Sequence, residues 1–328
     1  MIGKDLRVIL ATDMDIGRVA IFGAAGAIGR VVADELERRF IPYRLVGRTR
    51  SKLEKAFSQH QHGEIFPADL NDLRSTAAAA REIDTILYTV GLPYPSHSLF
   101  PGMMRTALEA AVNMKVQRFV LVSNVYSYGV PRTAKVAETH PRFPVATKGA
   151  YRREQEDLVL DAHQKGRLQG MVVRLPDFYG PHAELSLAHQ VFQAAIAGKT
   201  ANWIGPVNPP HEFVFVPDLG PSLVDLMACS ECYGESWNIG GVGQINTLDF
   251  LTRVYRAAGR APKYRAVGKG LLKIAGWFSP LMRELPEMVY LQETPVILDD
   301  SKLLAKFPGT RKTPYDEGIV KTVEWMRQ

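Results

Sequence analysis

The sequence predicts an α/β fold, a doubly wound parallel sheet with a smaller C-terminal lobe. Near the start of the chain, an apolar run leads into three glycines spaced three residues apart and then into a helical period. Apolar strands and helices then alternate as far as residue 175, which is typical of parallel sheets. From residue 176 onwards, prolines interrupt this regularity. We therefore divide the chain into an N-terminal extension (1–17), an alternating domain (18–175) and an interleaved lobe (176–328).

The first strand, turn and helix lie within residues 18–30, RVAIFGAAGAIGR. Gly23 permits a tight turn out of the strand, Gly26 lets the backbone approach a diphosphate, and Gly29 lets the helix pack closely on the sheet. The start of the helix offers free N–H groups and a partial positive charge to an anion. A glycine triplet alone also fits a turn that binds nothing. If this Rossmann-type loop binds a dinucleotide, we expect the binding residues to be Gly23, Ala25, Gly26, Ala27, Ile28 and Gly29.

The second predicted strand, 43–46, ends close to Arg48, at the position that distinguishes NAD from NADP. A carboxylate here would bind the 2′-hydroxyl of NAD, but the segment GRTR (47–50) contains none. An arginine suits a 2′-phosphate because its planar guanidinium donates two parallel hydrogen bonds to phosphate oxygens. We therefore predict NADP(H) in preference to NAD(H), with Lys52 assisting Arg48. A solvated loop arginine is the alternative.

The later elements place polar residues at one edge of the sheet. Ser123, Asn124, Tyr126 and Tyr128 follow a buried strand, and doubly wound sheets bind ligands at the carboxyl ends of their strands. These side chains should therefore belong to one site. The elements predicted beyond residue 50 are helices over 51–60, 73–80, a segment including 107–112, and 152–163, and strands over 64–66, 85–90, 119–122 and 170–174.

Composition and charge restrict the partners. Hydrophobic residues at 46% and charged residues at 23% are ordinary for a globular protein. The formal net charge is +6, but Lys and Arg are spread along the chain, without the dense basic run of a nucleic-acid-binding tail. No signal peptide or apolar run of transmembrane length is visible. We expect a cytoplasmic protein with a small-molecule substrate, no nucleic acid, no metal site and no membrane span; a homodimer stays open.

Cys229 and Cys232 form a C-x-x-C pair. A structural zinc needs four ligands, and the sequence offers no second pair. A redox pair is expected at the start of a helix, whereas these cysteines end a helical run. We expect two inert thiols.

The most apolar stretch, 270–291, contains Lys273, Pro280, Arg283 and Pro286. It fits a membrane-surface segment, although a substrate-pocket or dimer helix pair is the more ordinary interpretation. In the N-terminal extension, residues 6–11 are compatible with an extra strand and Met14 with a second translation start. The aromatic residues expected to wall the substrate pocket, each with core packing as its alternative, are Trp203, His211, Phe213, Trp277 and Phe278.

Several motifs follow one another in a recognisable order. They are GAAGAIG at 23–29, VSNVYSYG at 122–129, RLPDFYGP at 174–181, HEFVFVPDL at 211–219 and NIGG at 238–241. In this order they resemble the extended short-chain dehydrogenase/reductase family, which includes nucleotide-sugar epimerases and dehydratases. The resemblance implies that Asp69 and Leu70 flank the adenine, that Thr89, Val90 and Gly91 line the cofactor ribose, and that Leu175 and Pro176 approach the nicotinamide.

The resemblance breaks at the catalytic residues. The family uses a Ser or Thr, a Tyr, and a Lys four residues after the Tyr. Here the segment TKGAYRREQE (147–156) puts Lys148 at the Tyr position and Arg152 at the Lys position, while Asn124 falls at the Ser position with Ser123 beside it. A lysine at this place resembles the atypical reductases of the isoflavone-reductase and NmrA-like type, in which it serves as acid/base or as cofactor anchor.

An ammonium group such as that of Lys148 is able to supply the proton that carbonyl reduction needs. Tyr126 and Tyr128 are alternative donors, and we favour Tyr126 because Tyr128 stands at the family's structural Tyr-Gly position. The histidines that offer further acid/base groups, although loop histidines are more often held by a hydrogen bond, are His97, His182 and His211.

The sequence leaves three functions open. The first is NADP(H)-dependent reduction of a small carbonyl or enone, with Lys148 or Tyr126 as proton donor and Ser123 and Asn124 binding the substrate oxygen. The second is a nucleotide-sugar epimerase or dehydratase. It is less favoured because its cycle begins with oxidation by a phenolate tyrosine, and that tyrosine is missing here. The third is a non-catalytic NADP-binding sensor or assembly factor, suggested by the missing Tyr/Lys pair.

Overall fold

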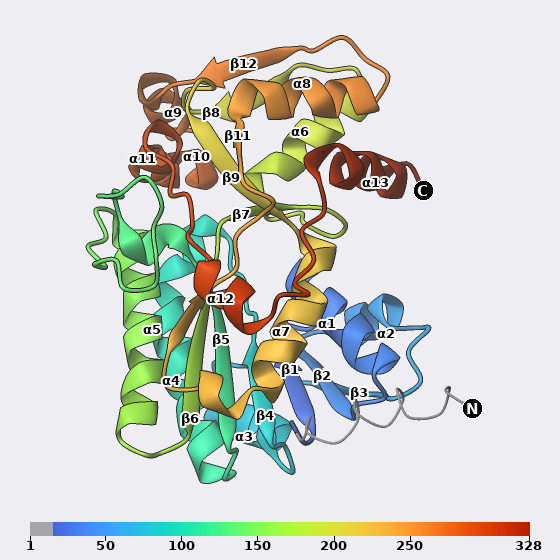
Figure 1. Ribbon diagram of the computed structural model, residues 1–328, viewed down its shortest axis with the longest axis vertical. Helices are drawn as coiled ribbons and strands as arrows, with labels where there is room; N and C mark the ends of the chain where they lie inside the picture. The colour runs from blue at the N-terminus through green and yellow to red at the C-terminus, as the bar shows by residue number, and fades with distance from the viewer. Residues whose placement is uncertain (1–15) are drawn as a thin grey trace.

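The computed structural model describes residues 16–328, and its centre is a parallel sheet (Figure 1). Within these residues the sheet has seven strands in the order β10-β6-β5-β4-β1-β2-β3. The chain runs outward from β1 to one edge and then, from β4, toward the other, so the predicted doubly wound α/β fold is confirmed. The strands are β1 (Val19–Phe22), β2 (Tyr43–Gly47), β3 (Gly63–Pro67), β4 (Thr85–Tyr88), β5 (Arg118–Asn124), β6 (Gln169–Leu175) and β10 (Ser236–Asn238).

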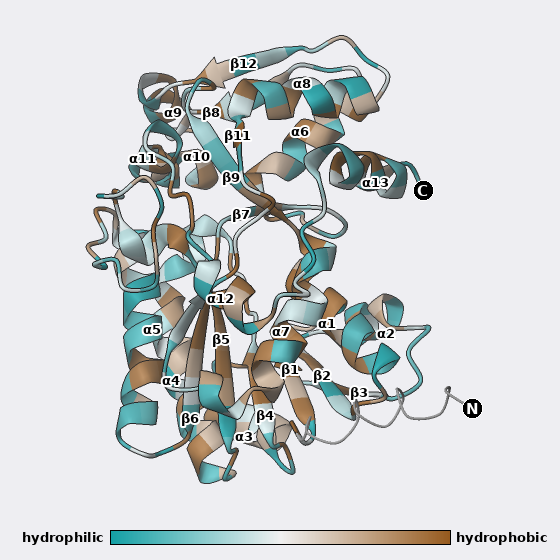
Figure 2. Ribbon diagram, viewed as in Figure 1, coloured by the Kyte–Doolittle hydropathy of each residue, from teal (hydrophilic) through white to brown (hydrophobic). Residues whose placement is uncertain are grey.

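Helices cover both faces of this sheet because its central strands are apolar on both sides. In β1, Val19 and Ile21 pack into one hydrophobic layer, whereas Ala20 and Phe22 pack into the other. Figure 2 shows β1 and β5 coloured as hydrophobic along much of their length. One face carries α1 (Ala27–Arg38), α2 (Arg50–Ala56) and α7 (Leu219–Ala228), and the other carries α3 (Leu73–Ala80), α4 (Phe100–Asn113) and α5 (Thr147–Gln164).

The second lobe has an aromatic core of its own. The rings of Phe213 and Phe250 stack with centroids 4.3 Å apart, and Trp203 packs beside Phe213. Trp203 and Phe213 are therefore core residues, which is the alternative that the sequence offered to a role in the pocket wall. The lobe contains β7 (Asp177–Tyr179), β8 (Ala201–Ile204), β9 (Pro210–Phe215), β11 (Gln244–Asn246), β12 (Tyr264–Val267), α6 (Leu187–Ile196), α8 (Thr247–Ala257), α9 (Lys269–Ala275), α10 (Pro280–Glu284), α11 (Tyr290–Glu293) and α13 (Tyr315–Arg327).

Residues beyond 176 divide between the lobe and the sheet. α7 packs on α1, and β10 pairs in parallel with β6 at the sheet edge. α12 (Ser301–Lys306) lies beside β10 before the chain returns to the lobe. The chain thus crosses more than once between the sheet domain and the second lobe, and this fixes the lobe above the carboxyl ends of the strands.

Most predicted elements occur, although some bounds differ: the helix expected over 152–163 begins at Thr147, and the strand expected over 85–90 ends at Tyr88. The helix expected over 51–60 ends at Ala56, because Phe57 leaves the helical conformation and the next hydrogen bond, from the His60 N–H to the Phe57 carbonyl, spans three residues in a turn instead of four in an α-helix. The cysteines predicted as inert thiols instead form a disulfide, since a 3₁₀ turn brings their Cα atoms to 5.3 Å, within disulfide range. The possible strand at 6–11 and the start at Met14 lie outside the described residues.

None of the helices between residues 16 and 328 has the length and apolar character needed to cross a bilayer.

Candidate functional site: a cleft at the carboxyl ends of the strands

A cleft of about 780 Å³ runs along the carboxyl edge of the sheet, beneath the second lobe. It brings together almost all the residues singled out in the sequence, although they come from many separate segments. The predicted site residues that line it are Gly23, Ala25, Gly26, Ala27, Ile28, Arg48, Asp69, Leu70, Thr89, Val90, Gly91, Ser123, Asn124, Tyr126, Leu175 and Pro176. The predicted cofactor-site and proton-donor residues outside its lining are Gly29, Lys52, Tyr128 and Lys148; the Tyr128 hydroxyl is buried and donates to Asn238 at 2.9 Å.

The glycine turn has the geometry of a dinucleotide cradle. Gly23 has φ of +91°, and a Cβ there would lie 3.0 Å from the backbone nitrogen of Val90. Gly29 is buried, and a Cβ on it would lie 2.6 Å from the Ala24 carbonyl oxygen, so only glycine lets α1 start this close to the turn. The N-terminus of α1 thus opens into the cleft behind Gly26, where an anion is stabilised by free N–H groups and the helix dipole.

The end of the cleft beyond β2 and β3 carries both a cation and a carboxylate. Arg48 follows β2, and Asp69 follows β3. Hydrogen bonds from the Asn71 backbone and side chain, with the nearby Arg48 charge, lower the pKa of Asp69, so it is ionised. This end therefore offers a guanidinium and a carboxylate to polar parts of a nucleotide.

Ser123 and Asn124 lie at the end of β5, in the middle of the cleft wall. The Ser123 hydroxyl donates to Glu156 at 2.7 Å, and Asn124 accepts from the Tyr126 N–H at 3.1 Å. Burial alone would raise the pKa of Glu156, but the Arg174 guanidinium and hydrogen bonds from the protein hold it below its ordinary value. The Ser123 hydroxyl proton is thus bound by the buried Glu156 carboxylate. Toward a ligand in the cleft, the Ser123 oxygen is left as an acceptor and the Asn124 amide nitrogen as a donor.

Lys148 lies on α5, close to the cleft but turned toward the second lobe. Its Nζ forms ion pairs with Glu284, at 2.5 Å, and with Glu287, and only 3% of its side chain is exposed. These carboxylates belong to α10 and to the 3₁₀ turn that follows it. In this arrangement Lys148 anchors the C-terminal segment that covers one end of the cleft.

Arg152, one helical turn along α5, does line the cleft. Its guanidinium lies 3.8 Å from the ring centroid of Phe100 and donates to Gln155, while its Nε is buried and has no partner within residues 16–328. Burial lowers the pKa of Arg152 to about 10, so it remains a cation at neutral pH. A positive charge thus occupies the position where the resembled family has its lysine.

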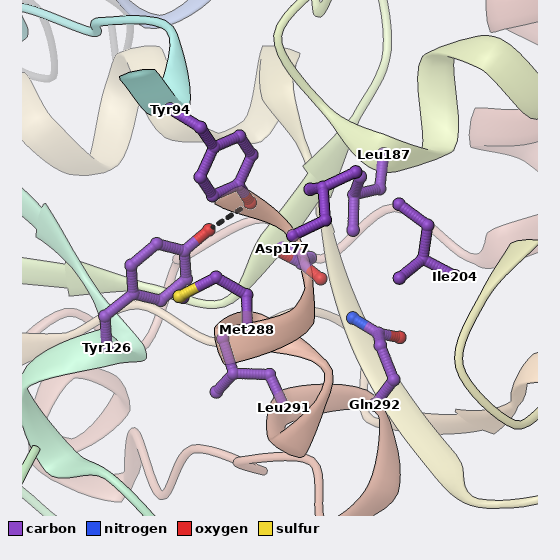
Figure 3. Close-up of a pocket in the computed structure, with 9 residues that line it drawn as sticks. Tyr94, Tyr126, Asp177, Leu187, Ile204, Met288, Leu291 and Gln292 are labelled. Atoms are coloured by element: carbon purple, nitrogen blue, oxygen red, sulfur yellow. Dashed lines mark hydrogen bonds between the residues drawn. The ribbon is translucent and has the colours of Figure 1, made fainter. Parts of the chain in front are cut away.

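Two tyrosines meet where the cleft reaches the second lobe (Figure 3). The hydroxyl groups of Tyr94 and Tyr126 lie 3.0 Å apart in a hydrogen bond, and the rings face a small cavity of about 10 Å³ that Asp177 and Gln292 also line. Burial raises the pKa of Tyr94 to about 12. Burial, Tyr94 and the Asp177 carboxylate raise the pKa of Tyr126 well above its ordinary value. Both phenols are therefore protonated at neutral pH, and each holds its proton more tightly than a free tyrosine does.

The three candidate histidines are dispersed. His97 lines the cleft, and burial with the nearby Arg152 charge lowers its pKa to about 3, which makes it a neutral imidazole. His182 also lines the cleft and packs edge-on against Trp325. His211 lies away from the lining, where its Nε2 and the Asp177 carboxylate are 2.8 Å apart. No group of three or more His, Cys, Asp or Glu in the described chain is placed to hold a metal ion.

Sequence reasoning missed Tyr94, Asp177 and the glutamates that bind Lys148. Tyr94 begins the 3₁₀ turn before α4 (Tyr94–Leu99), and no sequence motif marks it as a site residue. The spacing of Glu284 and Glu287, three residues apart, was the available signal, since such residues share one side of a helical turn. Nothing in the sequence pairs Glu284 and Glu287 with a lysine 136 and 139 positions away, respectively.

Comparisons with known proteins agree with this geometry. A profile of the NAD dependent epimerase/dehydratase family matches residues 19–240, and the chain belongs to this family. The resemblance to the extended short-chain dehydrogenases/reductases is thereby confirmed.

Curated relatives are distant. An uncharacterized UDP-glucose epimerase of Bacillus subtilis is 22% identical over 271 residues, covering 74% of this chain and 83% of the relative. A dTDP-glucose 4,6-dehydratase of Streptomyces niveus is 24% identical over 221 residues, covering 67% of this chain and 60% of the relative.

Solved structures share the fold. A dTDP-glucose 4,6-dehydratase from Bacillus anthracis, in complex with NAD, superposes with a TM-score of 0.79 at 16% identity, covering 95% of this chain and 96% of that one. A UDP-glucose 4-epimerase from Thermus thermophilus, also with NAD, gives 0.77 at 22% identity, covering 94% and 99%.

Proposed function

We propose that this chain is a nicotinamide-dinucleotide-dependent enzyme that oxidises or reduces a carbinol or carbonyl carbon, as epimerases and dehydratases of its family do. One observation carries the proposal. A single cleft runs from the glycine turn to the Asn124 amide and the Tyr126 phenol, so a bound dinucleotide and a substrate oxygen have room in one continuous site.

The residues of the cleft fit the cofactor. The Gly23–Gly29 turn and the α1 N-terminus suit the diphosphate, Asp69 and Leu70 suit the adenosine end, and Leu175 with Pro176 supplies an apolar wall. A nicotinamide, when bound, supplies the hydride donor or acceptor. For the phosphorylation state of the ribose we favour NADP(H), because Arg48 follows β2 where NAD-binding chains carry a carboxylate.

The relatives favour a nucleotide sugar as substrate. The curated matches are named as an epimerase of UDP-glucose and a dehydratase of dTDP-glucose. In this chain the Asn124 amide would bind the reacting oxygen. Tyr126, whose phenol stays protonated, would donate the proton when a carbonyl is reduced.

A specific observation supports a second candidate, the reduction of a small carbonyl or enone. The lobe end of the cleft is walled by Leu281, Met282 and Leu285, and among the described residues that line the cleft the only Lys or Arg are Arg48 and Arg152. A nucleoside diphosphate usually meets several cations, whereas a small apolar carbonyl compound needs none.

A substrate screen tests the proposal. The purified chain is incubated with UDP-glucose or dTDP-glucose and each oxidised or reduced dinucleotide, and in parallel with small aldehydes, ketones and enones plus NADPH. Conversion of the nucleotide sugar to an epimer or a 4-keto product supports the first candidate, and NADPH oxidation by a small carbonyl supports the second. Dinucleotide binding without conversion of any of these compounds would contradict the enzymatic proposal and favour a binding protein.

A further inference from the structure

An apolar surface projects from the second lobe at α9 and the turn that follows it. We call residues 271–281 the α9–α10 tip. Trp277 is 80% exposed, Phe278 85%, Ile274 57% and Leu271 52%. Trp277 and Phe278 therefore do not wall the pocket, as the sequence suggested, but point away from the protein. α9 buries only Leu272, so most of its apolar side chains have no place in the core.

The tip lies in a stretch with a one-sided charge. Residues 250–283 contain eight Lys or Arg and no Asp or Glu. Within the described residues, Lys273 and Arg283 form no ion pair, whereas Lys269 pairs with Glu293 at 2.7 Å. From residue 259 to 274 almost every residue is exposed or half-exposed. The basic residues are Arg253, Arg256, Arg260, Lys263, Arg265, Lys269, Lys273 and Arg283.

We propose that the α9–α10 tip docks on the surface of a lipid bilayer that contains anionic lipids. Exposed Trp and Phe favour the boundary between headgroups and acyl chains, and Lys and Arg near them are attracted by anionic headgroups. Residues 250–283 carry eight basic residues and no acidic one, and this one-sided charge complements an anionic lipid surface. Docking of this kind needs no membrane-spanning helix.

The position of the tip connects docking to the cleft. Leu281 is 43% exposed and also lines the cleft, as do Met282 and Leu285 from the same segment. Glu284, on α10, holds this segment to Lys148 on α5. A bilayer at the tip would therefore lie beside the lobe end of the cleft.

Vesicle binding of the full chain tests the proposal. The protein is sedimented with vesicles of phosphatidylcholine alone or mixed with phosphatidylglycerol, at low and high salt. We expect binding to the anionic vesicles, weakened by salt, and a blue shift of tryptophan emission as Trp277 leaves water. The double variant W277S/F278S should lose binding, and K273E/R283E should lower partitioning about fivefold or more for each basic residue replaced.

Matched controls separate docking from folding. Phe40→Ser removes another exposed aromatic residue, 77% exposed, near the far end of α1, and should leave vesicle binding unchanged. All three variants replace exposed side chains, so circular dichroism should show native folding. Equal binding by the wild type and W277S/F278S, or no binding to anionic vesicles, would overturn the proposal. The proposal would also be overturned if the wild type formed a dimer that the W277S/F278S substitutions dissociate and did not bind vesicles, because the tip would then bind a second copy.

Discussion

Arg48 is the residue on which we propose that the choice of dinucleotide depends. Replacing it with alanine removes a guanidinium that suits a 2′-phosphate, so the Arg48→Ala variant should bind NADPH about tenfold to a hundredfold more weakly while NADH binding changes little. Fluorescence titration of both dinucleotides measures this difference. Arg50→Ala is the matched control, because Arg50 is also exposed but pairs with Glu54 and lies outside the cleft lining. Equal losses for NADPH and NADH would refute the 2′-phosphate interpretation.

Tyr126 is the proposed proton donor, and its raised pKa sets the sign of the pH dependence. A phenol that donates its proton is active below its pKa, so carbonyl reduction should show no loss attributable to Tyr126 between about pH 6 and about pH 9. Oxidation needs the deprotonated form and should accelerate as pH rises. Tyr126→Phe should lower turnover about a hundredfold with dinucleotide binding retained. Turnover that is unchanged in this variant would assign the proton to another group.

Two roles are proposed for Lys148, as an anchor for the C-terminal segment that carries Glu284 and Glu287 and as a proton donor. Lys148→Ala leaves Glu284 and Glu287 without their cation, and the free energy of unfolding should fall by about 1–2 kcal/mol, less than for a fully buried pair because both glutamates are about a third exposed. Adding Glu287→Gln relieves the repulsion, so stability measured by urea unfolding should partly recover. If Lys148 also donates the proton, turnover stays low in the double variant; turnover that recovers with stability identifies an anchor alone.

Among the elements, the β1–turn–α1 unit is stable only if the start of α1 packs closely against the glycine turn. A Cβ at Gly29 would meet the Ala24 carbonyl oxygen at 2.6 Å, so Gly29→Ala should lower the free energy of unfolding by about 1–3 kcal/mol and weaken dinucleotide binding. At Gly102 in α4, an added methyl group would have no neighbouring atom within 4 Å, and Gly102→Ala should stabilise the protein by about 0.5–1 kcal/mol. Thermal unfolding measures both, and a destabilisation of the same size at both positions would contradict the packing argument.

The elements that the sequence predicted are those with a local pattern. β1, α1 and the strands up to β6 were predictable because apolar runs and helical periods are encoded within a few residues, and so was the edge of the sheet where Asn124 and Tyr126 meet the glycine turn. The pairing of Lys148 with Glu284, and of Tyr94 with Tyr126, depends on contacts between distant segments. The Cys229–Cys232 bond was missed because it depends on the turn geometry between the two residues, which composition does not reveal.

At the scale of the whole molecule, the second lobe closes one end of a cleft that begins at the glycine turn, and β10 and α7 tie that lobe to the sheet. We propose that this cleft binds a dinucleotide. Calorimetric titration of the purified chain with NADPH, NADH and their oxidised forms tests it most directly. We expect saturable binding of one dinucleotide per chain, tightest for the NADP form if Arg48 binds a 2′-phosphate. Failure of all four to bind a folded protein would contradict it.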